Sequence, residues 1–224
     1  METIIAIDGP AASGKSTVAR LVAAKLGGTY VNTGDMYRAL TWVALRHGVD
    51  PAANPGAVAA LLPGLALEFR LDAPGQPVLY LNGVTVPQAE IRAPAVAAAV
   101  SHVAKIPEVR TWLLARQRDT RSLGLIVMEG RDIGTVIFPD APFKFFVTAS
   151  PEVRARRRLL QAGETADGAT IATVAAEIAE RDRLDSTRAV APLKPAPDAV
   201  LLNTDALTAD QAAEQIAQTV RTRG

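Results

Sequence analysis

The stretch Gly9-Pro10-Ala11-Ala12-Ser13-Gly14-Lys15-Ser16 follows an apolar run, Ile4 to Asp8, and precedes a helix-like segment. Its glycines let successive backbone N–H groups turn around an anion, Lys15 can reach the outer phosphates of a nucleotide, and the Ser16 hydroxyl can ligate Mg²⁺. The positive end of the following helix dipole points at the same phosphates. The alternative is a glycine turn beside an incidental lysine. We favour a nucleotide-binding P-loop, whose phosphate-binding residues would be Gly9, Pro10, Ala11, Ala12, Ser13, Gly14, Lys15, Ser16 and Thr17.

The overall composition limits the partners of the chain. Its 224 residues suit one α/β domain with a small insert, and a net charge of +1 argues against a broad surface for nucleic acid. There is no cysteine, and His47 and His102 form no metal-ligand pattern, so we expect only the Mg²⁺ that arrives with a nucleotide. No leader precedes the first strand, and no apolar run approaches the roughly 20 residues of a membrane span. We therefore expect a cytoplasmic monomer with no membrane or nucleic-acid partner.

Short apolar runs alternate with segments of helical periodicity along the chain. Residues 3–8, 29–32, 125–128, 143–148 and 199–203 are typical of buried strands. Helical spacing marks residues 18–26, 36–46, 96–105, 108–121, 151–161, 171–184 and 209–221. Ser150 before Pro151, and Thr208 with Gln211, are typical helix-start signals. The alternation predicts an α/β fold, with a central parallel sheet, helices on both faces and ligands at the carboxyl ends of the strands.

One region departs from this rhythm. Leu67 to Leu71 and Val78 to Leu81 alternate in period two around the sequence Pro74-Gly75-Gln76-Pro77, and a short run, Val84 to Val86, follows. This pattern predicts a hairpin in a small antiparallel sheet, within an insert from about residue 63 to 92. The insert is either a surface elaboration without function or a substrate-side subdomain.

A charged cluster, Glu129-Gly130-Arg131-Asp132, comes directly after the apolar run 125–128. In a parallel sheet, the exit of a strand lies at the ligand crevice, so Arg131 and Asp132 would lie beside the P-loop strand if the two strands are neighbours. A plain surface turn would have a similar sequence.

Another charged group continues a helical stripe. Ile171, Val174 and Ile178 predict an inward face, and Arg181, Asp185 and Arg188 follow in the same register. A buried face that ends in charges favours entry into a polar pocket. A partly buried ladder of ion pairs would have the same spacing.

The helix beginning at Pro151 carries four arginines, Arg154, Arg156, Arg157 and Arg158, and leads into a loop of small and polar residues from Gly163 to Gly168. This combination is typical of a movable lid whose arginines close over transferring phosphates. Arg154 and Arg158 share one face and Arg156 and Arg157 diverge from it, so only some can point inward. A solvated basic face would account for the others.

Four stretches together resemble the bacterial cytidylate kinase family, the (d)CMP kinases of the nucleoside monophosphate kinase group. They are residues 7–17, the motif Thr33-Gly34-Asp35-Met36-Tyr37-Arg38, residues 129–135 with 138–141, and residues 181–193. The resemblance extends over nearly the whole chain. It implies a single P-loop kinase unit, residues 1–224, with a core of residues 1–62 and 122–224, a CMP-binding insert of about 63–121 and a helical lid of about 151–169.

The resemblance also implies phosphoryl transfer from ATP to CMP or dCMP, with Mg²⁺ ligated by Ser16. The residues that would hold the acceptor phosphate are Thr33, Arg38, Arg131 and Arg188. The cytosine edge would be bound by Ser101, Arg110 and Asp132, and the sugar hydroxyls by Asp185 with Arg181. Tyr37 and Gly130 would complete the substrate site. The residues expected at the transferring group are Lys15, Arg131, Arg188, Arg154, Arg157 and Arg158. A carboxylate facing the cytosine amine would also face O4 of uracil, so Asp132 would discriminate against UMP.

Two residues depart from the family pattern. Asp35 stands where the resemblance leads us to expect alanine, and its carboxylate could cap the following helix or pair with Arg38. Glu129 occupies a position often held by aspartate, and either residue could orient the shell of the Mg²⁺ ion through water. The alternatives for the whole chain are another small-molecule P-loop kinase, acting on UMP, AMP or shikimate, a nucleotide-driven switch, and a non-catalytic nucleotide-binding module. The switch is disfavoured because the chain has no guanine-reading Asn-Lys-x-Asp segment.

Overall fold

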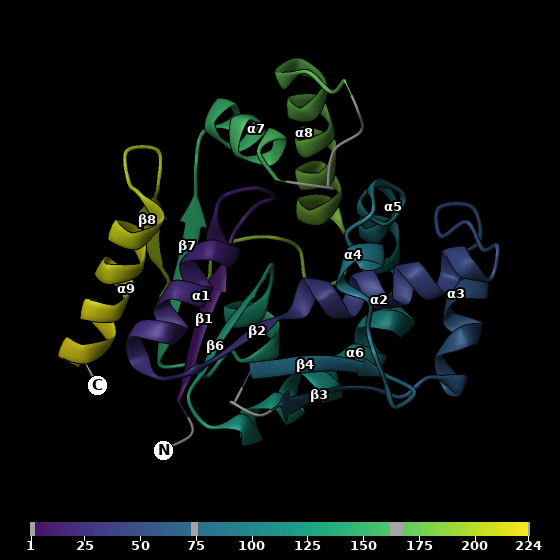
Figure 1. Cartoon of the computed structure of the whole chain (residues 1–224), viewed down its shortest axis with the longest axis horizontal. Coiled ribbons are helices and arrows are strands. Elements are labelled where there is room, and N and C mark those ends of the chain that lie inside the picture. Colours follow the sequence, from purple (N-terminus) through teal and green to yellow (C-terminus); the bar gives the residue numbers. More distant parts are fainter. Residues whose placement is uncertain (1–2, 73–75, 162–167, 224) are drawn as a thin grey trace.

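The structure is a computed structural model that describes residues 3–72, 76–161 and 168–223. Its centre is a five-stranded parallel sheet with the strand order β2-β6-β1-β7-β8 (Figure 1). The strands are β1 (Ile4–Asp8), β2 (Thr29–Asn32), β6 (Ile126–Gly130), β7 (Phe143–Thr148) and β8 (Val200–Asn203). Each agrees with its predicted run within two residues. The prediction of a parallel α/β sheet is therefore confirmed.

Helices cover both faces of this sheet, because successive side chains of a strand point to opposite sides. Ile5 and Ile7 of β1 pack on one face with α1 (Lys15–Leu26) and α9 (Ala209–Arg223). Ile4 and Ala6 pack on the other face, against the π-helical turn Ile133–Ile137. The capping box predicted before α9 forms as expected, since the backbone N–H of Gln211 donates to the Thr208 hydroxyl and that of Thr208 to the Gln211 side chain.

A second core is built mainly from the segment between β2 and β6 in the sequence. It brings together Leu40 of α2, Leu67 and Leu79 of an antiparallel sheet, and Leu113 of α6. The sheet consists of β3 (Leu67–Asp72), β4 (Gln76–Leu81) and β5 (Val84–Thr85). The helices of this region are α2 (Thr33–Arg46), α3 (Pro55–Leu61), α4 (Gln88–Ile91), α5 (Pro94–Ala104) and α6 (Pro107–Asp119). Two 3₁₀ turns lie at Leu62–Gly64 and Thr120–Leu123. The hairpin therefore shares buried side chains with the helices instead of standing apart as a surface elaboration.

The predicted hairpin forms, but β4 begins earlier than the sequence suggested. Gln76 and Pro77 belong to β4 and pair with Asp72 and Leu71. Pro77 is tolerated there because β4 has β3 on one side and only the two-residue β5 on the other. The other predicted turn residues, Pro74 and Gly75, lie outside the described residues.

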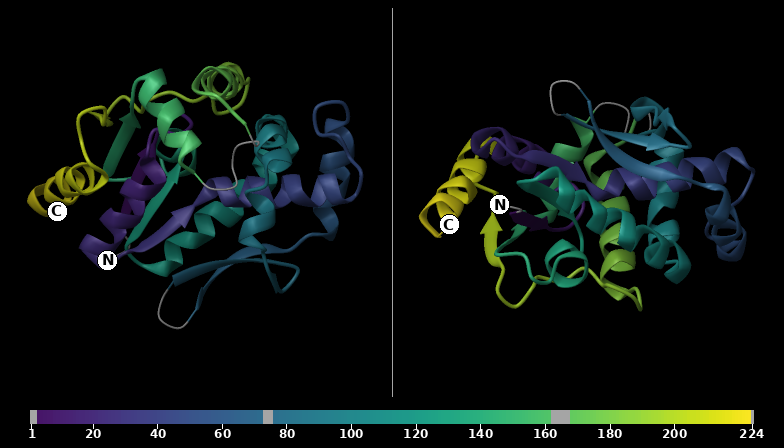
Figure 2. Two further views of the ribbon diagram at one scale, coloured as in Figure 1. Left: turned by 45° about the horizontal axis from the view of Figure 1, so that its top comes forward. Right: turned by 90° about the horizontal axis from the view of Figure 1, so that it is seen from below.

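The helix pair α7 (Pro151–Leu159) and α8 (Ile171–Thr187) lies beyond the carboxyl ends of β1 and β7 (Figure 1). Ser150 caps α7, as predicted, by accepting a hydrogen bond from the Val153 N–H. Residues 163–167 of the predicted lid loop lie outside the described residues. In all three views of Figures 1 and 2, α9 and α3 lie at opposite ends of the molecule, with this pair between them.

The predicted stripe on α8 is wrong at both ends. Val174 and Ile178 are buried, but Ile171 is 45% exposed because it lies in the first turn, beyond the packed surface. The helix ends at Thr187, and Arg188 is extended, with φ −62° and ψ 143°. Asp185 is therefore the last buried residue within the helix.

No helix among the described residues is long and apolar enough to cross a membrane.

Candidate active site

The P-loop connects β1 to α1 and lies tightly against the sheet. A Cβ atom at Gly9 would lie 2.1 Å from the Val147 carbonyl oxygen, so only glycine fits. Ala12 and Gly14 have φ angles of 56° and 88°, and left-handed residues of this kind make successive N–H groups converge on an anion. The buried Ser13 hydroxyl has no hydrogen-bond partner within the described part of the chain. The loop therefore offers polar groups suited to phosphate oxygens.

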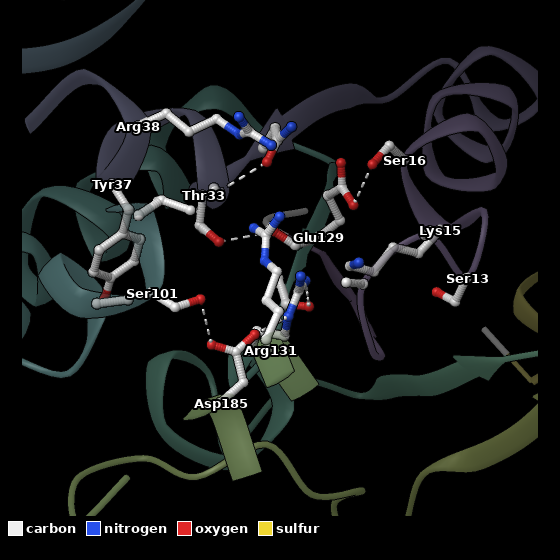
Figure 3. Close-up of a pocket in the computed structure, with 18 of the residues that line it drawn as sticks. Ser13, Lys15, Ser16, Thr33, Tyr37, Arg38, Ser101, Glu129, Arg131 and Asp185 are labelled. Atoms are coloured by element: carbon white, nitrogen blue, oxygen red, sulfur yellow. Dashed lines mark hydrogen bonds and ion pairs between the residues drawn. The ribbon is translucent and has the colours of Figure 1, made fainter. Parts of the chain in front are cut away.

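Lys15 opens α1 and reaches into the centre of the site, toward Arg131 and Glu129 (Figure 3). Its Nζ donates a 3.0 Å hydrogen bond to the Pro10 carbonyl. Burial, with a smaller contribution from the positive charge of Arg131, lowers the pKa of Lys15 to about 7. A bound phosphate would restore the charge of Lys15, because an adjacent anion favours the protonated form.

Glu129, the next-to-last residue of β6, is 1% exposed, and its carboxylate lies between two hydroxyl groups. Ser16 donates to Oε2 at 2.8 Å, and Tyr30 of β2 donates to Oε1. The Thr33 hydroxyl donates to the Glu129 backbone carbonyl at 2.9 Å (Figure 3). A hydroxyl and a carboxylate are the oxygen donors that suit Mg²⁺. Across residues 3–72, 76–161 and 168–223 no cluster of three or more His, Cys, Asp or Glu could hold a metal ion.

Beyond the exit of β6, charged side chains from three regions form one buried network. Asp132 accepts from Arg110 of α6 and lies 3.5 Å from Nη2 of Arg188. Asp185 accepts from Nε of Arg131 at 2.9 Å and from the Ser101 hydroxyl at 3.4 Å. Arg188 also lies 3.7 Å from Asp185 and thereby links the two carboxylates.

This network controls the ionisation of Asp185. Burial alone would raise its pKa, but the positive charges of Arg131, Arg181 and Arg188 together hold the pKa below its usual value. The ion pairs therefore join several elements and do not form the alternative, a ladder along one helix. An acidic pair surrounded by arginines can accept hydrogen bonds from a ligand while the arginines bind its anionic part.

Asp35 does not cap α2. The cap is Asn32, whose side chain accepts from the Gly34 N–H. Both Asp35 oxygens accept from Nη2 of Arg92 at 2.9 Å, which ties α2 to the end of α4. Burial raises the pKa of Asp35 to about 6, although Arg92 and Arg38 oppose this shift. Arg38 in turn donates to the Ile91 carbonyl at 3.2 Å.

The arginines of α7 have different positions. Arg154 donates to the Ala11 carbonyl at 3.2 Å and pairs with Asp182 of α8, which itself accepts from the Ala11 N–H. Arg157 donates to the Ser13 carbonyl at 3.0 Å and to Thr204. Both guanidinium groups thus bind carbonyl groups of the P-loop main chain and do not line the cavity. Arg156 is exposed and pairs with Glu152.

A cavity of about 460 Å³ joins the P-loop to this charged network. The predicted residues that line it are Ala11, Ala12, Ser13, Gly14, Lys15, Ser16, Thr17, Thr33, Tyr37, Arg38, Ser101, Arg110, Gly130, Arg131, Asp132, Arg158, Arg181, Asp185 and Arg188. Four predicted residues lie off its wall, namely Gly9, Pro10, Arg154 and Arg157. The cavity therefore spans a phosphate-binding loop at one end and a buried acid–base network at the other.

A sequence model described as "Cytidylate kinase" matches residues 5–222 of the chain. The chain belongs to the cytidylate kinase family. It is 48% identical over 215 residues to a cytidylate kinase of Pelotomaculum thermopropionicum, covering 95% of this chain and 93% of the relative. A cytidylate kinase of Nocardia farcinica is 47% identical over 218 residues, with 97% and 93% covered.

One further relative is a longer protein, and one solved structure is of a more distant protein. A bifunctional pantoate ligase/cytidylate kinase of Prochlorococcus marinus is 46% identical over 216 residues, which are 96% of this chain and 42% of that protein. The crystal structure of an uncharacterized protein from Eubacterium ventriosum superimposes with a TM-score of 0.55 at 13% identity, covering 99% of each chain. At that identity the likeness shows the shared fold alone.

Several residues on the cavity wall of this cytidylate kinase family member were not predicted from the sequence. They are Arg20, Tyr30, Asn32, Gly34, Gln88, Arg92, Val100, Ala104 and Gln161, while Glu129 was singled out without an assigned role. Tyr30 belonged to a predicted strand and Arg92 to the predicted insert, and neither carries a local motif. Their positions follow from tertiary packing, which brings β2 beside β6 and α4 beside α2.

Proposed function

We propose that the chain transfers the γ-phosphoryl group of ATP to CMP or dCMP and releases ADP with CDP or dCDP. The observation that supports this most directly is that one continuous cavity has the P-loop at one end and the buried Asp132–Arg110 pair at the other. Membership of the cytidylate kinase family supports the same reaction.

On the donor side, the P-loop N–H groups and Lys15 hold the phosphates of ATP. Mg²⁺, held by Ser16 with Glu129 beside it, would neutralise phosphate oxygens and orient the γ-phosphoryl group. Arg158 lines the cavity and contributes positive charge near the nucleotide. Arg154 and Arg157 position the loop itself through the Ala11 and Ser13 carbonyl groups.

On the acceptor side, Asp132 and Arg110 read the cytosine edge with help from Ser101, while Asp185 and Arg181 contact the sugar. Thr33, Arg38, Arg131 and Arg188 hold the acceptor phosphate, and the insert of about residues 63–121 contributes Ser101 and Arg110 to this half of the site. Tyr37 packs beneath the base-reading pair, with the Arg110 guanidinium 5.5 Å from its ring centroid. Asp132 accepts a hydrogen bond from the cytosine amine and repels O4 of uracil.

The reaction needs positioning and charge neutralisation rather than a covalent enzyme group. An acceptor phosphate oxygen forms a bond to the γ-phosphorus while the bond to the β,γ-bridging oxygen breaks, and ADP leaves with that electron pair. Lys15 and Arg131 approach the same region from opposite ends of the cavity, where they stabilise the equatorial oxygens of the transferring group.

The deciding experiment measures ADP release from ATP and Mg²⁺ with CMP, dCMP, UMP and AMP offered separately. We expect rapid turnover with CMP and dCMP only. A preference for UMP or AMP would retain phosphoryl transfer and refute the assignment of Asp132 and Arg110. Nucleotide binding without acceptor-dependent release would instead favour a non-catalytic module.

A further inference from the structure

Glu129 is held from two directions by hydroxyl groups on different elements. Its Oε2 accepts from Ser16, the first hydroxyl of α1, at 2.8 Å, and its Oε1 accepts from Tyr30 on β2 (Figure 3 shows the Ser16 contact). The Thr33 hydroxyl fixes the backbone carbonyl of the same residue. Each oxygen of this buried carboxylate therefore has a defined donor, and the plane of the carboxylate is set by Tyr30 and Ser16 together.

Tyr30 is itself firmly placed. The Arg20 guanidinium lies 5.1 Å from its ring centroid, and both residues line the cavity. Burial and the negative charge of Glu129 raise the pKa of Tyr30 above its usual value, so the hydroxyl stays protonated and remains a donor. The pairing of β2 with β6 brings Tyr30 beside Val127 and leaves its long side chain beside Glu129.

We propose that Tyr30 is a positioning residue for the metal–nucleotide half of the site and acts through Glu129. The Ser16 hydroxyl can offer a lone pair to a cation only when its O–H bond points elsewhere. Glu129 Oε2 fixes that direction because it accepts the hydrogen bond from Ser16. Tyr30 keeps Oε2 turned toward Ser16 by occupying Oε1. Partners that orient a metal's ligands in this way contribute strongly to metal affinity. This inference rests on the proposed use of Mg²⁺ with a nucleotide.

The test compares ADP binding by calorimetry with Mg²⁺ present and with Mg²⁺ removed by EDTA. Tyr30→Phe removes one hydroxyl and keeps the ring under Arg20. The matched control is Tyr80→Phe, a strand tyrosine whose ring lies 4.7 Å from the Arg70 guanidinium and away from the cavity wall. We expect Tyr30→Phe to weaken ADP binding about tenfold with Mg²⁺ and to leave binding in EDTA unchanged. Tyr80→Phe should match the unsubstituted protein in both.

A double-mutant cycle with Glu129→Gln tests whether Tyr30 acts through Glu129. If it does, adding Tyr30→Phe to Glu129→Gln causes no further loss of the Mg²⁺-dependent gain. Two results would overturn the proposal: an unchanged Mg²⁺-dependent gain in Tyr30→Phe, or an equal loss with and without Mg²⁺, which would indicate general packing. If the unsubstituted protein bound no ADP at all, the proposed donor would be wrong, which is a different failure.

Glu129→Asp provides a second route if Tyr30→Phe folds poorly. Withdrawing the carboxylate by one methylene group should break at least one of the two hydroxyl contacts while the charge remains. We expect the Mg²⁺-dependent gain in ADP affinity to fall severalfold, with EDTA binding unchanged. Full retention of the gain would show that neither hydroxyl contact matters, and would overturn the proposal.

Discussion

The two ends of the cavity are built in different ways. The donor end is one continuous segment, residues 9–17, in which main-chain N–H groups and the start of α1 supply most of the positive potential. The acceptor end collects side chains from α2, α5, α6, the exit of β6 and the end of α8. Its arginines are paired with carboxylates, such as Arg131 with Asp185 and Arg110 with Asp132.

This difference has a consequence for binding. Backbone dipoles are fixed by the fold, so the P-loop is ready for phosphate before any ligand arrives. At the acceptor end, the pairing of arginines with Asp132 and Asp185 avoids isolated buried charges. An acceptor must therefore compete with these carboxylates for the arginines. Substitutions at the acceptor end should change turnover and selectivity, whereas donor binding should depend on the P-loop.

The largest expected effect is that of Arg131→Ala. We expect turnover to fall about 10³-fold, because the transferring group loses a cationic partner and Asp185 loses its strongest one. ATP binding, measured by calorimetry, should change less than about twofold, since the P-loop is intact. Arg156→Ala is the matched control, because Arg156 is exposed and pairs only with Glu152 in the contacts described above. An equal loss of ATP affinity would contradict the division between the two ends.

Asp132→Asn should have the next largest effect and sharpens the role of the acceptor network. The side chain keeps its shape but loses the charge that faces Arg110 and Arg188. We expect kcat/KM for CMP to fall about 100-fold and the preference for CMP over UMP to fall about tenfold. Steady-state kinetics with both acceptors measures the two quantities. Equal losses for CMP and UMP would mean that Asp132 only holds the arginines in place.

The same division explains how much could be predicted from the sequence. The P-loop was fully readable because its function depends on a local backbone path, and its glycines and Lys15 are adjacent in the chain. The strands were predicted because their apolar runs are short and buried. At the acceptor end, strand-exit and helix patterns singled out Arg131 and Asp185. Ser101 came only from the family resemblance, since nothing local in the sequence places it beside Asp185.

What the sequence did not reveal depends on packing between distant segments. Arg92 contacts Asp35 across 57 positions, and Tyr30 contacts Glu129 across 99. The short helices α3 and α4 were missed because seven and four residues carry too little periodicity. Ile171 fitted the periodicity of α8, but periodicity does not say where the packed surface ends.

A smaller effect is expected for Asp35→Ala, which introduces the residue that the family resemblance leads us to expect. Arg92 would lose both oxygens that hold it on the cavity wall beside Arg38. Because the Arg92 side chain is 33% exposed, the pair contributes modestly, and we expect KM for CMP to rise about threefold with little change in kcat. Glu90→Ala, on the outer side of α4, is the control. A lower KM would show instead that Asp35 repels the acceptor phosphate.

The smallest expected effect concerns Lys15, the only charged side chain within residues 9–17 of the donor end. Because its pKa is lowered to about 7, Lys15 is mostly neutral at about pH 8 before a nucleotide binds. Phosphates raise that pKa, so binding at about pH 8 should take up close to one proton, and the uptake should vanish as the pH falls below about 6. Calorimetry in two buffers of different ionisation enthalpy measures this uptake.

Lys15→Arg separates this proton from any proton carried by the nucleotide itself, because arginine stays protonated throughout this range. The uptake at about pH 8 should disappear in that variant, whereas any contribution of the nucleotide's own phosphates should remain. Unsubstituted protein that bound ATP at about pH 8 without proton uptake would show that Lys15 is already charged. In that case the donor end would resemble the acceptor end, with its cation stabilised before the ligand arrives and Glu129 as the nearest candidate for the compensating charge.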